Sequence, residues 1–384
     1  MNCRARVLTA LNHKEPDRVP FDLGGTYVSG INIKAYKALR VFLGMPEINT
    51  AIMDVIQQIV WVDDDVIDRL RADVKNVSLR FPSNYRPNIE ETADHTYFYD
   101  EFKLGWRMPK DGGLYYDLFH NPLAGNITVE DVNTFPWPDP LDPARFIGLR
   151  ERARSIIEDE NRAVTIGWLH AGMMELFAFL RGFPDYFSDF AANQKLAGVI
   201  MDRVLEMQLA YWNKIFDTVG EYVDVVMVHD DFAGQNEMLI SPKTYRTMCK
   251  PRHKQLISFM HSRSNAKVFF HSCGSIRPVI PDLIEIGVDI INPVQVSSRG
   301  MDTAELKREF GRDLAFWGGG IDTQRVLGTG TPQQIRDEVT RRLADLMPEG
   351  GFIFTPVHNI QANVPPENIM AMWETLQEYG GYRR

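Results

Sequence analysis

Short apolar runs, rich in β-branched residues, recur along the chain and are separated by segments with helical periodicity. Runs that stay apolar at successive positions indicate strands that are buried on both faces, as the strands of a parallel sheet are. The pattern predicts eight such strands, over residues 19–24, 73–78, 163–168, 223–230, 267–272, 288–294, 313–319 and 351–358.

The segments between the later strands are typical of amphipathic helices. Residues 333–347, for example, are apolar at Ile335, Val339, Leu343 and Leu346, and this spacing places the four side chains on one helix face. Because strand and helix alternate in this way, the strands are expected to be parallel, and eight such units predict a closed (β/α)8 TIM barrel. An open doubly wound sheet is the alternative, but no GxGxxG turn follows a first strand.

Residues 80–145 interrupt this alternation and are rich in aromatic residues, proline and glycine. The portion TYFYDEFKLGWRM predicts paired β-ribbons, and FPWPDPLDP predicts an extended connection. So few aliphatic side chains would give a separate domain only a thin core. We therefore interpret residues 1–384 as one barrel domain and residues 80–145 as an insertion between strands two and three that covers the barrel mouth. Its aromatic residues either pack together or shape a pocket for an aromatic substrate, and they include Tyr97, Trp106, Tyr115 and Tyr116.

Composition and charge exclude several classes of protein. The 384 residues are 44% hydrophobic and 24% charged, which is ordinary for a globular chain. No apolar run approaches the ~20 residues that span a bilayer, and the N-terminal stretch lacks the apolar core of a secretory signal. We therefore expect a cytoplasmic protein without a membrane partner. The net charge of −9 and the scattered basic residues disfavour nucleic-acid binding.

The strand ends supply the candidate functional residues, because the active sites of such barrels lie at the carboxyl ends of the strands. We expect Asp230, Asp231 and His358 to be catalytic. The other polar and aromatic residues at these ends are expected to bind substrate: Asp22, Thr26, Trp168, His170, His229, Asn292, Gln295, Trp317 and Asn359.

A metal site is expected after the fifth predicted strand. His271 and Cys273 are two positions apart, so an extended backbone directs both side chains to the same face. An imidazole and a thiolate together suit zinc. His358 is the best candidate for a third ligand, and Asp230, Asp231 or Glu237 is a source of a ligand oxygen. The alternative interpretation is that Cys273 is a small buried hydrophobe and that His358 hydrogen-bonds a substrate or the backbone.

The three cysteines, Cys3, Cys249 and Cys273, are too few for a disulfide framework. Cys249 lies in a segment that predicts a helix, where it is expected to pack in the core.

Several stretches resemble the uroporphyrinogen decarboxylase superfamily, and the resemblance extends along nearly the whole chain. They are RARVLTALNHKEPDRVPFD, LISPKTYRTMCKPRHKQLI, LAFWGGGIDTQRVLGTGTPQQIRDEV and FTPVHNIQANVPPENIMAM. The spacing from His358 to the Pro365-Pro366-Glu367-Asn368 sequence is the most specific feature. The resemblance implies the (β/α)8 barrel that the strand pattern predicts independently.

Decarboxylases of this superfamily carry an N-terminal RQAGRY stretch whose arginines engage the many carboxylates of the substrate. Here the region is DLGGTYVSGINIKAYKAL, and no arginine lies between Arg18 and Arg40. Since a desolvated carboxylate needs a partner, the decarboxylation of a polyacidic tetrapyrrole is disfavoured.

The sequence His271-Ser272-Cys273-Gly274 is similar to the HxCG element of the zinc-dependent methyltransferases in the superfamily. These enzymes usually carry a cysteine where this chain has His358. The resemblance implies transfer of a methyl group between a small molecule, either a methoxylated compound or a thiol, and a corrinoid protein. Two alternatives stay open: a metal-independent decarboxylase or lyase acting on a small or tetrapyrrole carboxylate, and a non-catalytic binder of a corrinoid or tetrapyrrole.

Overall fold

A computed structural model describes residues 1–46, 48–167 and 170–382 of the chain. Its central sheet has seven parallel strands in the order β13-β12-β11-β10-β9-β8-β3. These strands are β3 (Val74–Asn76), β8 (Ala163–Gly167), β9 (Val225–His229), β10 (Lys267–His271), β11 (Ile290–Asn292), β12 (Ala315–Trp317) and β13 (Phe352–Ile353).

A short extended segment closes the sheet between β13 and β3. The Asp22 N–H donates to the Phe354 carbonyl at 2.9 Å, and the Phe354 N–H donates to the Pro20 carbonyl at 2.9 Å. On the other side, the Asp73 N–H donates to the Phe21 carbonyl at 2.8 Å. Residues 20–22 therefore occupy the eighth position, and the predicted (β/α)8 barrel is confirmed.

The first predicted strand, over residues 19–24, is wrong in its extent, because only an isolated bridge between Phe21 and Phe354 forms there. Pro20 has no N–H to donate to a ladder. Gly24 turns the chain at a φ of +88°, a conformation that glycine adopts without a steric penalty.

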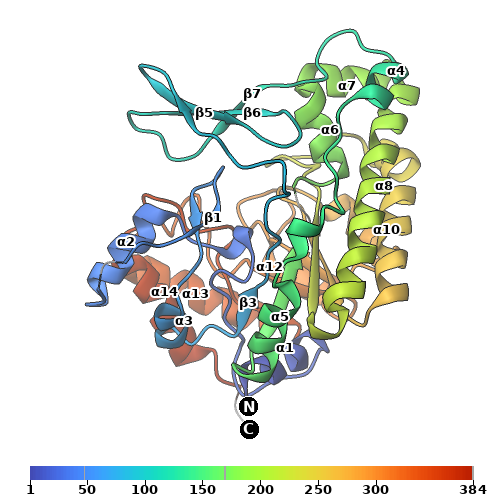
Figure 1. Ribbon diagram of the computed structural model, residues 1–384. Helices are drawn as coiled ribbons and strands as arrows, with labels where there is room; N and C mark the ends of the chain where they lie inside the picture. The colour runs from blue at the N-terminus through green and yellow to red at the C-terminus, as the bar shows by residue number, and fades with distance from the viewer. Residues whose placement is uncertain (47, 168–169, 383–384) are drawn as a thin grey trace.

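Helices surround the barrel (Figure 1). They are α1 (Cys3–Leu11), α2 (Ile33–Phe42), α3 (Asp64–Arg69), α4 (Val129–Thr134), α5 (Leu149–Glu158), α6 (Met173–Arg181), α7 (Phe183–Ala192), α8 (Gln194–Val219), α9 (Pro242–Thr244), α10 (Lys250–Arg263), α11 (Ile280–Glu285), α12 (Thr303–Phe310), α13 (Pro332–Leu346) and α14 (Pro366–Tyr379). The helix predicted over residues 333–347 is confirmed as α13. It begins with a capping box, in which Thr331 and Gln334 each bond the backbone N–H of the other.

Shorter elements connect these helices and strands. A hairpin pairs β1 (Ile52–Asp54) with β2 (Ile59–Val60). A π-helical turn, Tyr245–Cys249, leads into α10 and holds Cys249 fully buried in the core. Single 3-10 turns form at Tyr27–Ser29, Pro143–Phe146, Gly220–Tyr222 and Arg277–Val279.

The barrel interior has an apolar core of its own, separate from the larger core between strands and helices. Strand side chains that point inward make up most of it: Val74, Ala163, Val225, Met227, Phe269, Ile290, Ala315, Trp317 and Ile353. Val7, Ala10 and Leu11 of α1 complete this core at one end, so the barrel is filled rather than hollow.

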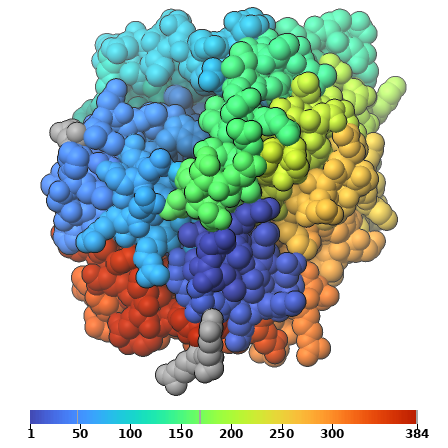
Figure 2. Space-filling view, turned by 60° about the horizontal axis from the view of Figure 1, so that its bottom comes forward, coloured from blue at the N-terminus to red at the C-terminus, as the bar shows by residue number. Residues whose placement is uncertain are grey.

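Helix α1 closes the amino-terminal end of the barrel. Its Arg4 pairs with Asp224 at 3.0 Å and its Arg6 pairs with Asp73 at 2.6 Å, and these two carboxylates directly precede β9 and β3. Figure 2 shows α1 in dark blue on this face, between the red carboxyl-terminal segment and the green segment that includes α5. The mouth of the barrel is therefore at the opposite end.

Residues 90–120 form a second, antiparallel sheet of four strands. Its strands are β4 (Glu90–Glu91), β5 (His95–Tyr99), β6 (Gly105–Pro109) and β7 (Asp117–His120). The pairing of β5 with β6 confirms the ribbon predicted from TYFYDEFKLGWRM. In Figure 1 this sheet lies at the opposite end of the molecule from α1 and the two termini.

The Asp73 carboxylate joins three segments at the base of the barrel. It accepts hydrogen bonds from Arg6 Nη1 at 2.6 Å, from Arg18 Nη1 at 2.7 Å and from the Phe21 N–H at 2.8 Å, and its side chain is fully buried. We expect Asp73→Asn to lower the free energy of unfolding by about 3 kcal/mol, because buried guanidinium groups would lose their counter-charge.

Urea denaturation of the full chain measures this change. Asp68→Asn is the matched control, since Asp68 also pairs with an arginine, Arg162, but its side chain is 68% exposed. That variant should change the free energy of unfolding by less than about 1 kcal/mol. Equal stabilities of the two variants would contradict the role assigned to Asp73.

Candidate metal centre

Three side chains converge at the barrel mouth. One nitrogen each of His271 and His358 and the sulfur of Cys273 all lie within 4.8 Å of one another. His271 ends β10, Cys273 follows two residues later, and His358 lies in the loop after β13. The two imidazole rings meet edge to face, with their centroids 5.6 Å apart. The structure thus brings together the residues that the sequence predicted as metal ligands.

A buried amide fixes the orientation of the His271 ring. The Asn292 Nδ2 donates to the Trp317 carbonyl at 2.6 Å, which leaves the amide oxygen to accept from His271 Nδ1 at 2.5 Å. The proton therefore resides on Nδ1, and the lone pair of Nε2 faces Cys273 Sγ at 3.6 Å. Histidine ligands in metal sites are held by a partner of this kind on their second nitrogen.

The turn after β10 is held by contacts to its backbone. The Cys273 N–H donates to Asp231 Oδ1 at 2.7 Å, and the Gly274 N–H donates to Gln295 Oε1 at 2.6 Å. Gly274 has a φ of +91°, and a Cβ at this position would lie 2.5 Å from the Ala233 carbonyl oxygen. The HxCG pattern thus has a steric cause at its glycine, which lets the turn pass close to the neighbouring loop.

The environment keeps the two histidines uncharged. Burial lowers the pKa of His358 to about 4 and also lowers the pKa of His271. Burial raises the pKa of the Cys273 thiol well above its usual value, and the nearby Asp231 and Glu175 add to this effect. Two neutral imidazoles and a thiol that a cation would deprotonate are a donor set that fits zinc.

Carboxylates and a tyrosine surround these three residues. The side chain of Asp231 is 36% exposed, and its Oδ1 lies 3.8 Å from His271 Nε2. Burial and the neighbouring Glu175 raise the pKa of Asp231. Burial, followed by the charges of Glu175, Asp54 and Asp231, raises the pKa of Tyr27 well above its usual value. The mouth around His271, Cys273 and His358 is therefore polar and acidic.

Sequence reasoning missed Tyr27, Asp54 and Glu175. Tyr27 directly follows the predicted candidate Thr26, and Glu175 lies in the first turn of the helix after the third barrel strand. A search that included the first turn of the helix after each strand, as well as the strand end itself, would have found Glu175. Asp54 lies on the β1 hairpin, which the sequence pattern did not predict.

His229 has no free ring nitrogen with which to bind a substrate. Its Nδ1 bonds Glu175 Oε2 at 3.0 Å, and its Nε2 bonds the His170 carbonyl. Burial by itself would lower the pKa of His229, but the contact with Glu175 raises it overall. His229 thus positions Glu175 at the edge of the mouth.

The carboxylate of Asp230 bonds the start of α6 and His253 rather than the candidate metal ligands, although we expected Asp230 to be catalytic. Its carboxylate is fully buried and accepts hydrogen bonds from the Met174 N–H at 3.0 Å and the Glu175 N–H at 2.8 Å. His253 Nε2 lies 2.9 Å from the same carboxylate. Asp230 therefore satisfies the free N–H groups at the start of α6, and only its neighbour Asp231 faces the mouth.

Six of the other expected substrate-binding residues are buried and bond neighbouring residues. Trp317 Nε1 donates to Asp22 Oδ2 at 2.8 Å, and burial raises the pKa of Asp22 to about 6. Thr26 bonds Ser29, and Asn359 Nδ2 donates to Gln57 Oε1 at 2.7 Å. Asn292 bonds the His271 ring, and Gln295 bonds the backbone N–H of Gly274. Trp168 lies outside the described residues.

His170 connects the mouth to the antiparallel sheet. Its Nε2 lies 2.8 Å from Asp100 Oδ2, and Trp106 Nε1 donates to the same oxygen at 2.8 Å. Tyr116 packs edge to face on Phe98 with their centroids 5.1 Å apart. These two aromatic side chains, Trp106 and Tyr116, thus pack within the sheet. Tyr115 is 47% exposed.

The comparison with known families agrees with this architecture. The sequence model of the uroporphyrinogen decarboxylase (URO-D) family matches residues 119–379, which is more than half of the chain. The chain belongs to this family. Its relatives include a methionine synthase and a uroporphyrinogen decarboxylase, both of them enzymes.

Two curated relatives illustrate these activities. A methionine synthase from Methanothermobacter thermautotrophicus is 23% identical over 282 residues, which cover 71% of this chain and 82% of the relative. A uroporphyrinogen decarboxylase from Pseudomonas fluorescens is 22% identical over 279 residues, or 69% of this chain and 73% of the relative.

A solved structure supports the fold along the whole chain. It is a methyltransferase from Methanosarcina mazei, with a TM-score of 0.65, 17% identity and 99% of each chain covered.

In the part of this chain that the structure describes, no helix is long and apolar enough to cross a membrane.

The contact between His170 and Asp100 makes stability depend on pH. Burial by itself would lower the pKa of His170, but Asp100 raises it above its usual value. The charged pair therefore contributes fully below about pH 6.5, and the contribution is lost as the pH rises through the raised pKa. We expect His170→Gln to lower the free energy of unfolding by about 1–2 kcal/mol at about pH 5.5, and by less at about pH 9.

Urea denaturation at the two pH values measures this difference. His120→Gln is the control, because His120 is exposed, contacts the ring of Tyr99 and pairs with no carboxylate of the described residues. The His170 variant contradicts the assignment if it loses the same free energy at both pH values.

Proposed function

We propose that the protein is a zinc-dependent methyltransferase that moves a methyl group between a small molecule and a corrinoid protein. The observation that carries the proposal is the convergence of His271, Cys273 and His358 at the barrel mouth. The small molecule is a thiol or a methoxylated compound. The methionine synthase among the relatives supports methyl transfer as the reaction class.

The donor set supports zinc as the cofactor. His271 Nε2, Cys273 Sγ and one nitrogen of His358 would hold the ion, and three protein ligands leave a position for substrate. Bound zinc supplies a Lewis acid, which lowers the pKa of a thiol or polarises the oxygen of a methoxy group. The bond from His271 Nδ1 to Asn292 would keep the lone pair of His271 Nε2 directed toward the ion.

With a thiol as acceptor, the reaction balances without an oxidant or a reductant. The thiol sulfur forms a bond to the methyl carbon, the cobalt–carbon bond breaks, and its electron pair stays on cobalt. The thiol proton leaves the site, and Asp231 is the partly exposed carboxylate beside the ligands that is placed to accept it. Transfer from a methoxylated compound runs in the opposite direction: the electron pair of Co(I) forms the bond to the methyl carbon, the carbon–oxygen bond breaks, and the oxygen takes up a proton and leaves as a hydroxyl group.

The charge of the mouth argues against a polyacidic substrate. The charges of Glu175, Asp54 and Asp231 raise the pKa of Tyr27, and the two imidazoles beside Asp231, those of His271 and His358, are uncharged. Several substrate carboxylates would be repelled here and would lack partners when desolvated. This observation favours methyl transfer over decarboxylation of a tetrapyrrole.

We also propose that residues 80–145 cover part of the mouth. The bond between Asp100 and His170 fastens the inserted sheet to the loop after β8, and the ring of Phe102 lies 5.0 Å from that of His170. A cover held at this side excludes water from the reacting groups and leaves the remaining side for a corrinoid protein to dock.

Metal content tests the ligand set. We expect purified wild-type protein that has been loaded with zinc to hold about one equivalent after desalting, and Cys273→Ser to hold less than about a fifth of that, because a neutral hydroxyl is a poor zinc ligand. Elemental analysis measures both values. Cys249→Ser is the matched control, since Cys249 is buried in the core away from the ligands. Full zinc occupancy in Cys273→Ser would contradict the site.

Methyl transfer tests the activity itself. We expect the zinc-loaded protein to convert methylcobalamin and a thiol into cob(I)alamin and a thioether under anaerobic conditions, followed by the absorbance of the corrinoid. Removal of zinc by a chelator should abolish the conversion, and addition of zinc should restore it. A panel of thiols and methoxyarenes identifies the substrate. Release of carbon dioxide from a carboxylate substrate, unaffected by the chelator, would instead establish the metal-independent alternative.

A further inference from the structure

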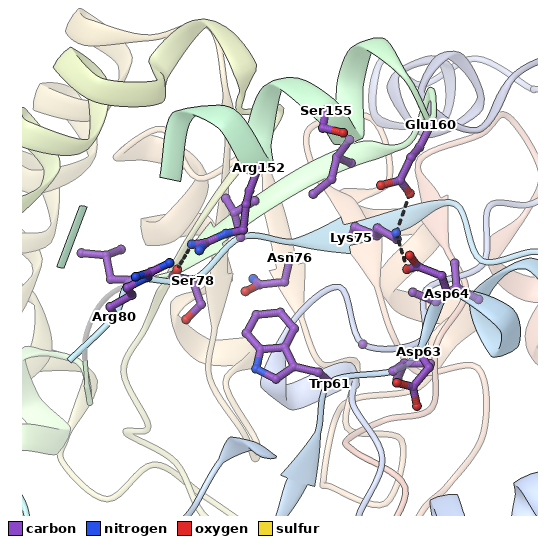
Figure 3. A pocket seen from close by; sticks show the side chains of 16 residues that line it. Trp61, Asp63, Asp64, Lys75, Asn76, Ser78, Arg80, Arg152, Ser155 and Glu160 are labelled. Atoms are coloured by element: carbon purple, nitrogen blue, oxygen red, sulfur yellow. Dashed lines mark hydrogen bonds and ion pairs between the residues drawn. The ribbon is translucent and has the colours of Figure 1, made fainter. Parts of the chain in front are cut away.

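A second cavity lies on the side of the barrel, apart from the metal centre. It has a volume of about 650 Å³ and lies between α5, the end of β3 and the segment that leads into α3. Figure 3 shows its main polar lining residues, and none of them belongs to the metal centre or to the carboxylates around it. A cavity of this size is within the range of small-molecule sites.

Two arginines define one end of this cavity. Arg152 extends from α5, and its Nη2 donates to the Ser78 carbonyl at 2.6 Å. Arg80 follows two residues after Ser78, and Figure 3 shows its guanidinium beside that of Arg152. Burial and then the positive charge of Arg80 lower the pKa of Arg152. The two groups therefore repel each other at the edge of the protein interior.

Arg152 differs from the other arginines of the described residues. Every other arginine there that is not exposed forms an ion pair with a carboxylate. Neither Arg152 nor Arg80 has a carboxylate of the described residues within ion-pair distance. A half-buried guanidinium without a counter-charge is costly, and an anionic ligand would remove this cost.

The opposite end of the cavity has more carboxylates than cationic groups among its lining residues. Lys75 pairs with Asp64 at 2.6 Å and with Glu160 at 2.5 Å. This end therefore does not require an anion, and the uncompensated positive charge lies at the arginine end alone.

An aromatic side chain, that of Trp61, lies between the two ends of the cavity. Figure 3 places the indole of Trp61 in the middle of the cavity, next to Asn76. Apolar side chains complete the lining around it, namely Val62, Ile67, Val77, Leu79 and Ile156. A flat ring gains contact area and stacking energy against an indole face.

We propose that this cavity binds a small ligand in which an oxyanion, either a carboxylate or a phosphate, is attached to a planar ring. The oxyanion lies between Arg80 and Arg152, where guanidinium groups bond oxyanions in a bidentate manner. The ring lies on Trp61. The site is independent of the metal centre, and its existence does not rest on the proposed methyl transfer.

Titration calorimetry of the zinc-loaded full chain tests the proposal. Benzoate and adenosine monophosphate are the probes, one for each oxyanion, and adenosine is the matched ligand without a charge. We expect at least one of the two anionic probes to bind with a Kd below about 1 mM, and adenosine to bind at least about tenfold more weakly. Tighter binding of benzoate would indicate a carboxylate ligand, and tighter binding of adenosine monophosphate would indicate a phosphate ligand. If neither anionic probe binds in this range, or if adenosine binds as tightly as its phosphate, the proposal is wrong.

Two substitutions localise the binding. Arg80→Gln and Arg152→Gln should each weaken the bound probe about tenfold, which is the loss of one charge-assisted hydrogen bond. Arg154→Gln is the control, because Arg154 lies on the same helix but is exposed, 3.8 Å from Glu158. Arg80 is also exposed, so its variant should fold normally even if Arg152→Gln is less stable. Unchanged affinity in the Arg80 variant would overturn the assignment.

Discussion

The parallel register of three neighbouring strands determines the geometry of the mouth. His271 pairs with His229 on one side and with Asn292 on the other, so the three side chains end their strands at one level. A shift of one residue would turn His271 toward the surrounding helices and separate it from Asn292. The inward-pointing apolar residues below, such as Phe269 and Met227, hold this register, because any slip would remove them from the barrel core.

Most polar residues near the mouth are used to support a few others. Asn292 holds His271, Gln295 holds the turn after Cys273, and His229 holds Glu175. Such an arrangement has a physical reason, since a buried polar group without a partner is costly and a partly satisfied network would leave the ligands free to rotate. Few side chains are therefore left to contact a substrate, and Asp231 and Tyr27 stand out among them.

The sequence predicted what depends on local pattern. Apolar runs and helical periodicity located the barrel strands and α13. A strand that is buried on both faces is apolar at successive positions, and a helix that is buried on one face is apolar at every third or fourth position. The alternation of side chains likewise placed His271 and Cys273 together. The role of Asp230 was not predictable in this way, since it depends on where the first turn of α6 approaches in space. The same limitation applies to Asp54, which reaches the mouth on a hairpin of only a few residues.

The candidate ligand set combines residues from distant parts of the chain. His271 and Cys273 belong to the fifth barrel unit, whereas His358 follows the last strand, β13, which pairs with β12 and closes against residues 20–22. A growing chain on the ribosome therefore cannot assemble all three ligands until synthesis is nearly finished and the first and last segments have met. Under the proposed function, an ion would be acquired late in biogenesis, and a prematurely terminated chain would lack the complete site.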